Sequence, residues 1–172
     1  MSVHSSKEFL EIKESGNNRN NPSKFSQKYN LDEIIYTIIL NGKESNGKYS
    51  LIQITFPYEK EKEVPLHKHS LEDVIIYVIE GSFIIRYGNE NIKSIPGMVL
   101  KLEKNIEHSY KKIGPDKGKL LVLFTPAGFE NYFRDLNSSS PVIKGDLNIL
   151  GKNDDRIRLH LLEKTYGWTF SM

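Results

Sequence analysis

The chain has no cysteine among its 172 residues. This absence excludes disulfides, thiolate metal ligands and a cysteine nucleophile. The first residues, MSVHSSKEFLEIKE, lack the apolar core of a signal peptide, and no apolar run is long enough to span a bilayer. The net charge is only +2, and lysines alternate with glutamates, as in YEKEKE. We therefore expect a cytoplasmic protein that has neither nucleic acid nor a membrane as its partner.

Short β-branched and aromatic runs dominate the chain between Leu31 and Thr125. They recur at intervals of about ten residues, and glycine, proline or asparagine separates most of them. No helical period is maintained across this region. The pattern predicts an antiparallel, all-β barrel built from the runs EIIYTIIL, KYSLIQITF, VIIYVIE, SFIIRYG, MVLKLE, EHSYKKI and KLLVLFTP.

The barrel is expected to have a polar arm before it and a helical extension after it. We assign residues 1–30 to the arm, 31–126 to the barrel and 127–172 to the extension. Within the arm, residues 13–28 have almost no apolar anchor, which predicts a mobile segment. Within the extension, apolar spacing and capping residues predict helices over 128–136 and 154–166.

One near-match to a phosphate-binding loop occurs in GKESNGKY. Tyr49 takes the place of the serine or threonine that would bind magnesium, and the segment leads into a predicted strand instead of a helix. A hairpin turn through Asn46 and Gly47 explains the segment better.

Three histidines form the candidate metal site. His67 and His69 lie in PLHKHSLEDVIIYVIEG, and alternate residues of a strand face the same side, so both imidazoles can reach one ion. His108 follows on another short strand, in NIEHSY. His4 and His160 lie in the arm and on the last predicted helix, and we expect neither to be a ligand.

These segments resemble the motifs of the cupin superfamily. PLHKHSLEDVIIYVIEG is similar to the first cupin motif and IPGMVLKLEKNIEHSY to the second, while TPAGFENYFRDL resembles the segment after the barrel in small, quercetin dioxygenase-like cupins. The resemblance implies a double-stranded β-helix, or jelly-roll barrel, with two short C-terminal helices and metal-ligand positions inside the barrel. It also implies a homodimer, since small cupins commonly pair.

The chain departs from the family pattern at the acidic ligand. Val74 occupies the position of the glutamate ligand, and Glu103 replaces the usual late proline of the second motif. Asp73 could substitute only through a β-bulge, because on a regular strand it faces away from Val74. Three neutral imidazoles can still bind iron, nickel, zinc, copper or manganese. Some cupins, the thiol dioxygenases among them, use three histidines and no glutamate.

These observations leave several functional hypotheses open. The first is a three-histidine divalent-metal site in a pocket for a small organic molecule, with oxygen-dependent, dioxygenase-like chemistry if the protein is an enzyme. Val74 opposes a flavonol-cleaving mechanism, because valine can neither coordinate a metal nor accept a proton. The alternative is a metal-free module that binds or senses a small molecule without catalysis. A third hypothesis is a structural cupin whose histidines are relics.

Overall fold

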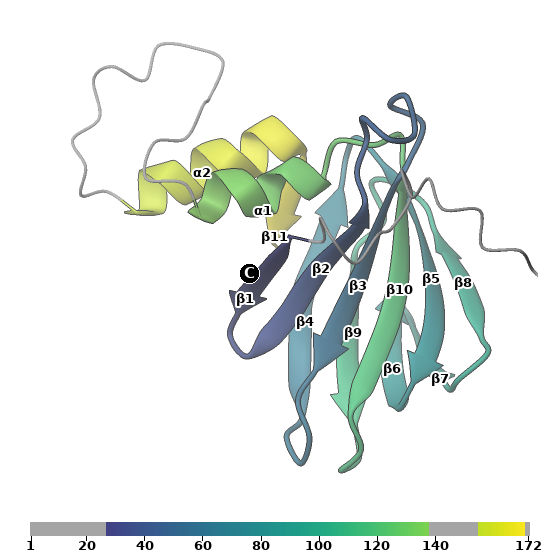
Figure 1. The fold of residues 1–172 in the computed structure, drawn as a ribbon. Helices are drawn as coiled ribbons and strands as arrows, with labels where there is room; N and C mark the ends of the chain where they lie inside the picture. The colour runs from purple at the N-terminus through teal and green to yellow at the C-terminus, as the bar shows by residue number, and fades with distance from the viewer. Residues whose placement is uncertain (1–26, 138–154, 171–172) are drawn as a thin grey trace, which may run out of the picture.

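The computed structural model describes residues 27–137 and 155–170 (Figure 1). The predicted mobile segment therefore lies outside the described residues, except for its last two positions. Strand structure begins at Lys28, inside the segment that the sequence assigned to the arm. Neither helix of the described part is long and apolar enough to cross a membrane.

Two antiparallel sheets face each other and enclose the core. One sheet has the strand order β1-β2-β3-β10-β5-β8 and the other β11-β4-β9-β6-β7. Strand neighbours far apart in sequence, such as β3 with β10 and β4 with β9, give the topology of a double-stranded β-helix and confirm the predicted all-β fold. The strands are β1 Lys28–Leu31, β2 Ile34–Leu40, β3 Ser50–Phe56, β4 Lys62–His69, β5 Asp73–Glu80, β6 Ser82–Tyr87, β7 Glu90–Ser94, β8 Val99–Leu102, β9 His108–Ile113, β10 Gly118–Thr125 and β11 Trp168–Phe170.

Alternation of side chains builds the core between the sheets. In β10, Leu120, Val122 and Phe124 are buried while the residues between them are partly exposed, as a strand with one face on a core requires. The same alternation runs through β3 and β5. Because each strand contributes every second residue, the histidines of β4 also point inward.

Two helices follow the barrel, α1 Glu130–Asn137 and α2 Asp155–Tyr166, within two residues of the predicted bounds. They lie together at one end of the barrel, next to β1 and β11 (Figure 1). Tyr132 and Phe133 of α1 are buried, and Leu162 of α2 has no exposed surface. The Tyr166 hydroxyl donates a hydrogen bond to Asp135, which ties the two helices together.

The sequence did not predict strand β11. Gly167 has a φ of +61° and leaves room for Ser70 and Leu71, whose side-chain atoms would lie 2.2 and 2.8 Å from an added Cβ. This turn lets the chain leave α2 and run antiparallel to β4. Backbone pairing with β4 places Trp168 directly opposite His69.

The predicted turn at Asn46 and Gly47 is present. Both residues have positive φ, +54° and +78°, which Asn-Gly pairs adopt readily in hairpin turns. The turn lies in the loop between the antiparallel strands β2 and β3. The segment is therefore not the start of a phosphate-binding helix.

Gly81 separates β5 from β6 and provides a test of this packing. Its φ is +80°, and a Cβ there would lie 2.6 Å from the Lys117 carbonyl oxygen. Gly47 has nearly the same φ, +78°, but an added Cβ would meet no atom within 4 Å. We expect Gly47→Ala to lower the free energy of unfolding by about 1 kcal/mol and Gly81→Ala by about 3 kcal/mol, because only the latter adds a backbone clash. Urea denaturation measures both, and equal losses would contradict this account.

Candidate metal centre

Pairing of β4 with β9 brings the three predicted histidines together. His67 lies directly opposite His108 in the register of the two strands, and His69 follows two residues later on β4. Their ring centroids are 4.4 to 5.6 Å apart. One nitrogen from each ring lies within 4.8 Å of the others. All three side chains are buried, at most 2% exposed.

Backbone carbonyls hold two of the rings in one tautomer. His67 Nδ1 lies 2.6 Å from Pro65 O, and His108 Nδ1 lies 2.9 Å from Ile106 O. A carbonyl oxygen only accepts hydrogen bonds, so each Nδ1 carries the hydrogen and each Nε2 carries the lone pair. His108 Nε2 is buried and has no hydrogen-bond partner among the described residues. A metal ion would satisfy this nitrogen.

Burial keeps the histidines in the form that binds metals. Burial, and secondarily His108, lowers the pKa of His67 to about 3. The pKa of His69 falls well below its ordinary value through burial and its two imidazole neighbours, and burial also lowers the pKa of His108. Neutral imidazole is the ligand form, so no proton has to be displaced near neutral pH. The cluster is compatible with a divalent metal.

Aromatic side chains close the space next to the histidines. Trp168 lies parallel to His69, with an interplanar angle of 1° and centroids 6.3 Å apart, and Phe129 meets the same imidazole edge-on at 4.4 Å. Strand β11 pairs with β4 at the histidines themselves, Trp168 opposite His69. The cavity that remains has a volume of about 20 Å³. This volume suffices for one ion or one water molecule.

The structure also locates the acidic residues around the predicted glutamate position. Val74 points into the barrel and is 1% exposed, so it presents methyl groups where the family has a carboxylate. Asp73 Oδ1 accepts a hydrogen bond from the Lys104 N–H at 2.9 Å, which fixes that side chain on the turn before β9. A bulge that turns Asp73 toward the histidines is not present.

Glu72 is the residue that sequence reasoning missed. It immediately precedes β5 and is 2% exposed, and its Oε2 lies 3.7 Å from His69 Nδ1. Burial, and secondarily Glu130, raises the pKa of Glu72 to about 7. The sequence feature that could have identified Glu72 is its spacing from Val74. The two residues are two positions apart, so both side chains can face inward.

The other histidine in the described part is separate from the cluster. His160 lies on α2, the last helix, as predicted, and is exposed, whereas His4 lies outside the described residues.

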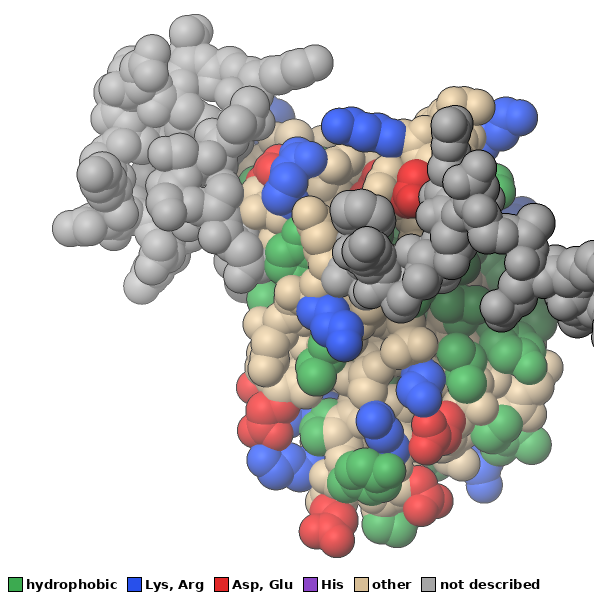
Figure 2. All heavy atoms as spheres, in the orientation of Figure 1, with side chains coloured by type: hydrophobic (Ala, Val, Ile, Leu, Met, Phe, Trp, Pro, Cys, Tyr) green, Lys and Arg blue, Asp and Glu red, His purple; other side chains and the backbone are tan. Residues whose placement is uncertain are grey.

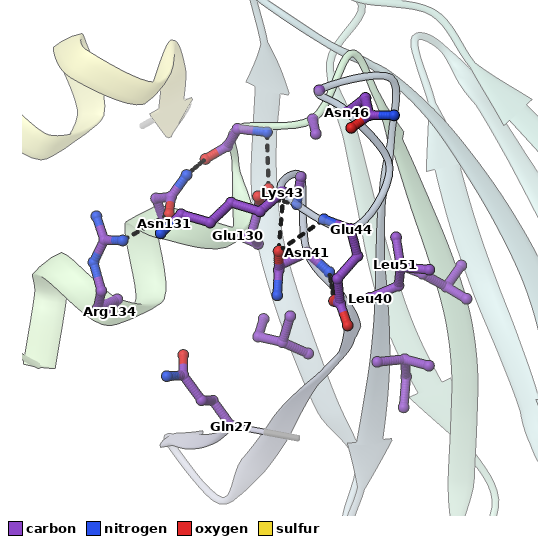
Figure 3. Close-up of a pocket in the computed structure, with 16 residues that line it drawn as sticks. Gln27, Leu40, Asn41, Lys43, Glu44, Asn46, Leu51, Glu130, Asn131 and Arg134 are labelled. Atoms are coloured by element: carbon purple, nitrogen blue, oxygen red, sulfur yellow. Dashed lines mark hydrogen bonds between the residues drawn. The ribbon is translucent and has the colours of Figure 1, made fainter. Parts of the chain in front are cut away.

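A second, larger hollow of about 1360 Å³ lies outside the barrel, between the β2–β3 loop and α1 (Figure 3). None of the three clustered histidines lines it. Its carboxylate Glu130 accepts the N–H groups of Gly42 and Gly128, each at 2.8 Å. Arg134 donates to Asn131 and to Asp135. The Glu130 contact with Gly42 joins the loop to α1, so Glu130 and Arg134 have a structural role here.

Comparisons with known proteins agree with the fold. Residues 55–124 match the family model described as Cupin domain. No curated protein matches the chain. Solved structures that resemble it include KdgF from Halomonas sp., with 19% identity and a TM-score of 0.52 over 61% of this chain and 90% of that one.

Two other structures have similar values. A predicted oxalate decarboxylase from Thermotoga maritima is 18% identical, with a TM-score of 0.53 over 59% of this chain and 91% of its own. An RmlC-like cupin from Shewanella frigidimarina is 18% identical, with a TM-score of 0.50 over 60% and 86%. The barrel thus has the cupin fold, and the family match supports the cupin superfamily.

The lowered pKa values predict acid sensitivity. Between about pH 6.5 and about pH 3 the unfolded chain protonates its histidines while folded His67 stays neutral, so stability falls as pH falls. Each such histidine contributes a slope of roughly 1.4 kcal/mol per pH unit. Glu72 changes the free energy of unfolding in the opposite direction with pH, because its pKa is raised. Its stabilising contribution is fully present below about pH 4.5 and is lost as the pH rises through about 7.

The free energy of unfolding of the metal-free protein, measured by urea denaturation from pH 7 to pH 4, should therefore decrease on the acid side. His67→Gln should make this decrease shallower, and His160→Gln, on the exposed face of α2, should leave it unchanged. An unaltered slope in His67→Gln would show that this ring is charged in the folded state.

Proposed function

We propose that this chain is a metal-binding cupin in which His67, His69 and His108 hold one divalent cation inside the barrel. The observation that carries the proposal is the buried cluster itself, with its ligand nitrogens within 4.8 Å and two rings oriented by carbonyls. Buried polar nitrogens without partners are unfavourable, and an ion removes that penalty. The hypothesis that the three histidines are relics of a lost metal site, held only by hydrogen bonds, explains the cluster less well. His108 Nε2 has no hydrogen-bond partner in the described part of the chain.

The donor set restricts the choice of ion only broadly. Three imidazoles without a thiolate suit iron, nickel, zinc, copper and, less tightly, manganese. When bound, such an ion supplies Lewis-acid polarisation of a small oxygen-containing ligand. The protein's own groups orient the imidazoles and exclude bulk water through the aromatic wall around the cavity.

Oxygen-dependent chemistry on a small organic molecule is the finer part of this proposal. The cavity of about 20 Å³ admits an ion or a water molecule, whereas organic ligands occupy pockets of roughly 300 Å³ or more. An organic substrate therefore requires Trp168 and β11 to move away from β4. The same volume weighs against the alternative of a metal-free binding module, because such a module needs a larger apolar pocket.

Metal titration tests the proposal directly. Zinc or nickel should bind the metal-free protein with a stoichiometry of one, as measured by isothermal titration calorimetry. His67→Ala, His69→Ala and His108→Ala should each abolish this binding, since two imidazoles do not make a closed site.

His160→Ala serves as the matched control, and it should bind like the native chain because His160 is exposed on α2. No binding to the native protein would reject the proposal, and unchanged binding in any of the three cluster variants would exclude that residue as a ligand.

A homodimer is the second proposal, and it rests on the outer face of the six-stranded sheet. Leu121, Tyr77 and Val99 lie opposite one another on β10, β5 and β8, and Tyr77 and Val99 are 42% and 63% exposed. Figure 2 shows hydrophobic side chains gathered on the side where Figure 1 places these strands. The other sheet differs, because its outward row is Lys93, Ile84 and Lys111. A second copy of the apolar face is the occupant that this contrast favours.

The mass in solution tests the dimer. Size-exclusion chromatography with light scattering should give a mass twice that of one chain. Tyr77→Lys should lower the measured mass to that of a single chain, because the lysine charge would be buried in the interface. Ile84→Lys, on the outer face of the other sheet, should leave the dimer intact. A native protein that stays monomeric at all concentrations would contradict the proposal.

A further inference from the structure

A buried carboxylate and a buried imidazole nitrogen face each other beside the metal centre. Glu72 Oε2 and His69 Nδ1 are 3.7 Å apart, and neither atom has a hydrogen-bond partner among the described residues. This separation exceeds the 2.7–3.2 Å of an ordinary N–H···O bond. Leaving both atoms unpaired is unfavourable by about 1–3 kcal/mol each. A separation shorter by about 0.5–1 Å would bring the two atoms into hydrogen-bond distance and satisfy both.

The other two histidines define what this contact does. In His67 and in His108, a backbone carbonyl holds Nδ1 and leaves the lone pair on Nε2. His69 has no carbonyl in this role, and Glu72 lies at its Nδ1 instead. An oxygen atom thus lies beside Nδ1 in all three rings: a carbonyl within hydrogen-bond distance in His67 and His108, and a carboxylate at 3.7 Å in His69.

We infer that Glu72 is the carboxylate of this metal centre: it accepts the Nδ1–H of His69 and orients that ring with Nε2 toward the ion. The inference deepens the proposed function and rests on it. Glu72 acts through His69 and is a positioning residue, because it lies beside Nδ1 and leaves Nε2 available to the ion. A carboxylate behind a ligating imidazole fixes its tautomer and raises its basicity.

This arrangement also explains how the site can tolerate Val74. Three neutral ligands leave the double charge of the ion uncompensated in a low-dielectric interior, where an opposing charge has its greatest effect. Glu72 brings a carboxyl group to the edge of the cluster from two residues earlier in the chain, and a bound cation would favour its negatively charged form. Gly128 lies beside this carboxylate, where a Cβ would be in ordinary van der Waals contact with Glu72 Oε1 at 3.9 Å, and Glu130 accepts the Gly128 N–H.

Two variants of Glu72 separate its charge from its hydrogen bond. Glu72→Gln keeps an oxygen acceptor of the same size and removes the charge, whereas Glu72→Ala removes both. The control is Asp73→Asn, which removes a carboxylate one residue away that contacts the Lys104 N–H instead of a histidine. Zinc affinity is measured by calorimetry, and the His69 tautomer in the metal-free protein by ¹⁵N NMR at neutral pH.

We expect Glu72→Gln to weaken zinc binding about tenfold and Glu72→Ala by up to about 100-fold, with Asp73→Asn within about twofold of the native affinity. The native chain and Glu72→Gln should have His69 in the Nδ1–H form, and Glu72→Ala should show a mixture of the two tautomers. A merely structural role for Glu72 would not alter the tautomer.

The inference is overturned if Glu72→Ala leaves the His69 tautomer unchanged, or if it binds zinc as tightly as the native protein does. Failure of the proposed function has a different signature. In that case the native chain binds no zinc. The His69 tautomer, measured in the metal-free native chain and the Glu72 variants, still shows whether Glu72 orients this ring.

Discussion

The register between β4 and β9 is the constraint on which the candidate site depends. It sets His67 opposite His108, and the alternation of β4 then points His69 to the same interior. A slip of one residue would turn the β4 histidines outward and bring their neighbours inward. The register shifts between Val64 and His67, so the pairing adjusts just before the first ligand position. The histidine cluster thus depends on strand pairing more than on any loop.

Burial then gives the cluster its chemical character. Imidazoles enclosed by Trp168, Phe129 and the barrel core remain neutral, and the carbonyls of Pro65 and Ile106 direct the hydrogen of two of them away from the centre. The same enclosure limits the cavity to about 20 Å³. Strand β11 therefore contributes to this enclosure: it pairs with β4 at the histidines, and its Trp168 lines the cavity.

Much of this arrangement could be predicted from local patterns. Short alternating runs separated by turn residues indicated the barrel, and the spacing of His67 and His69 placed both on one face of a strand. In the sequence, the resemblance to the family leads to Val74 and its neighbour Asp73, and it assigns no role at the site to Glu72. Its proximity to His69 depends on the chain path before β5, and its neighbour Gly128 comes from a distant segment, so neither is a local property. Strand β11 was missed for a related reason, since three residues after a helix have no period to detect.

The sequence by itself determined the fold class and the placing of His67 and His69 on one face of a strand, because each depends on residue type and on short-range spacing. The resemblance to the cupin motifs added His108 and the valine at position 74, where it implies a glutamate. Only the tertiary structure decided that a C-terminal strand covers the cluster, that the remaining cavity accepts an ion and little more, and that a carboxylate from position 72 stands behind His69. These features join segments that are distant along the chain, and their contacts arise from packing between β4, β5, α1 and β11. Periodicity records which way a side chain faces, but not what it meets there.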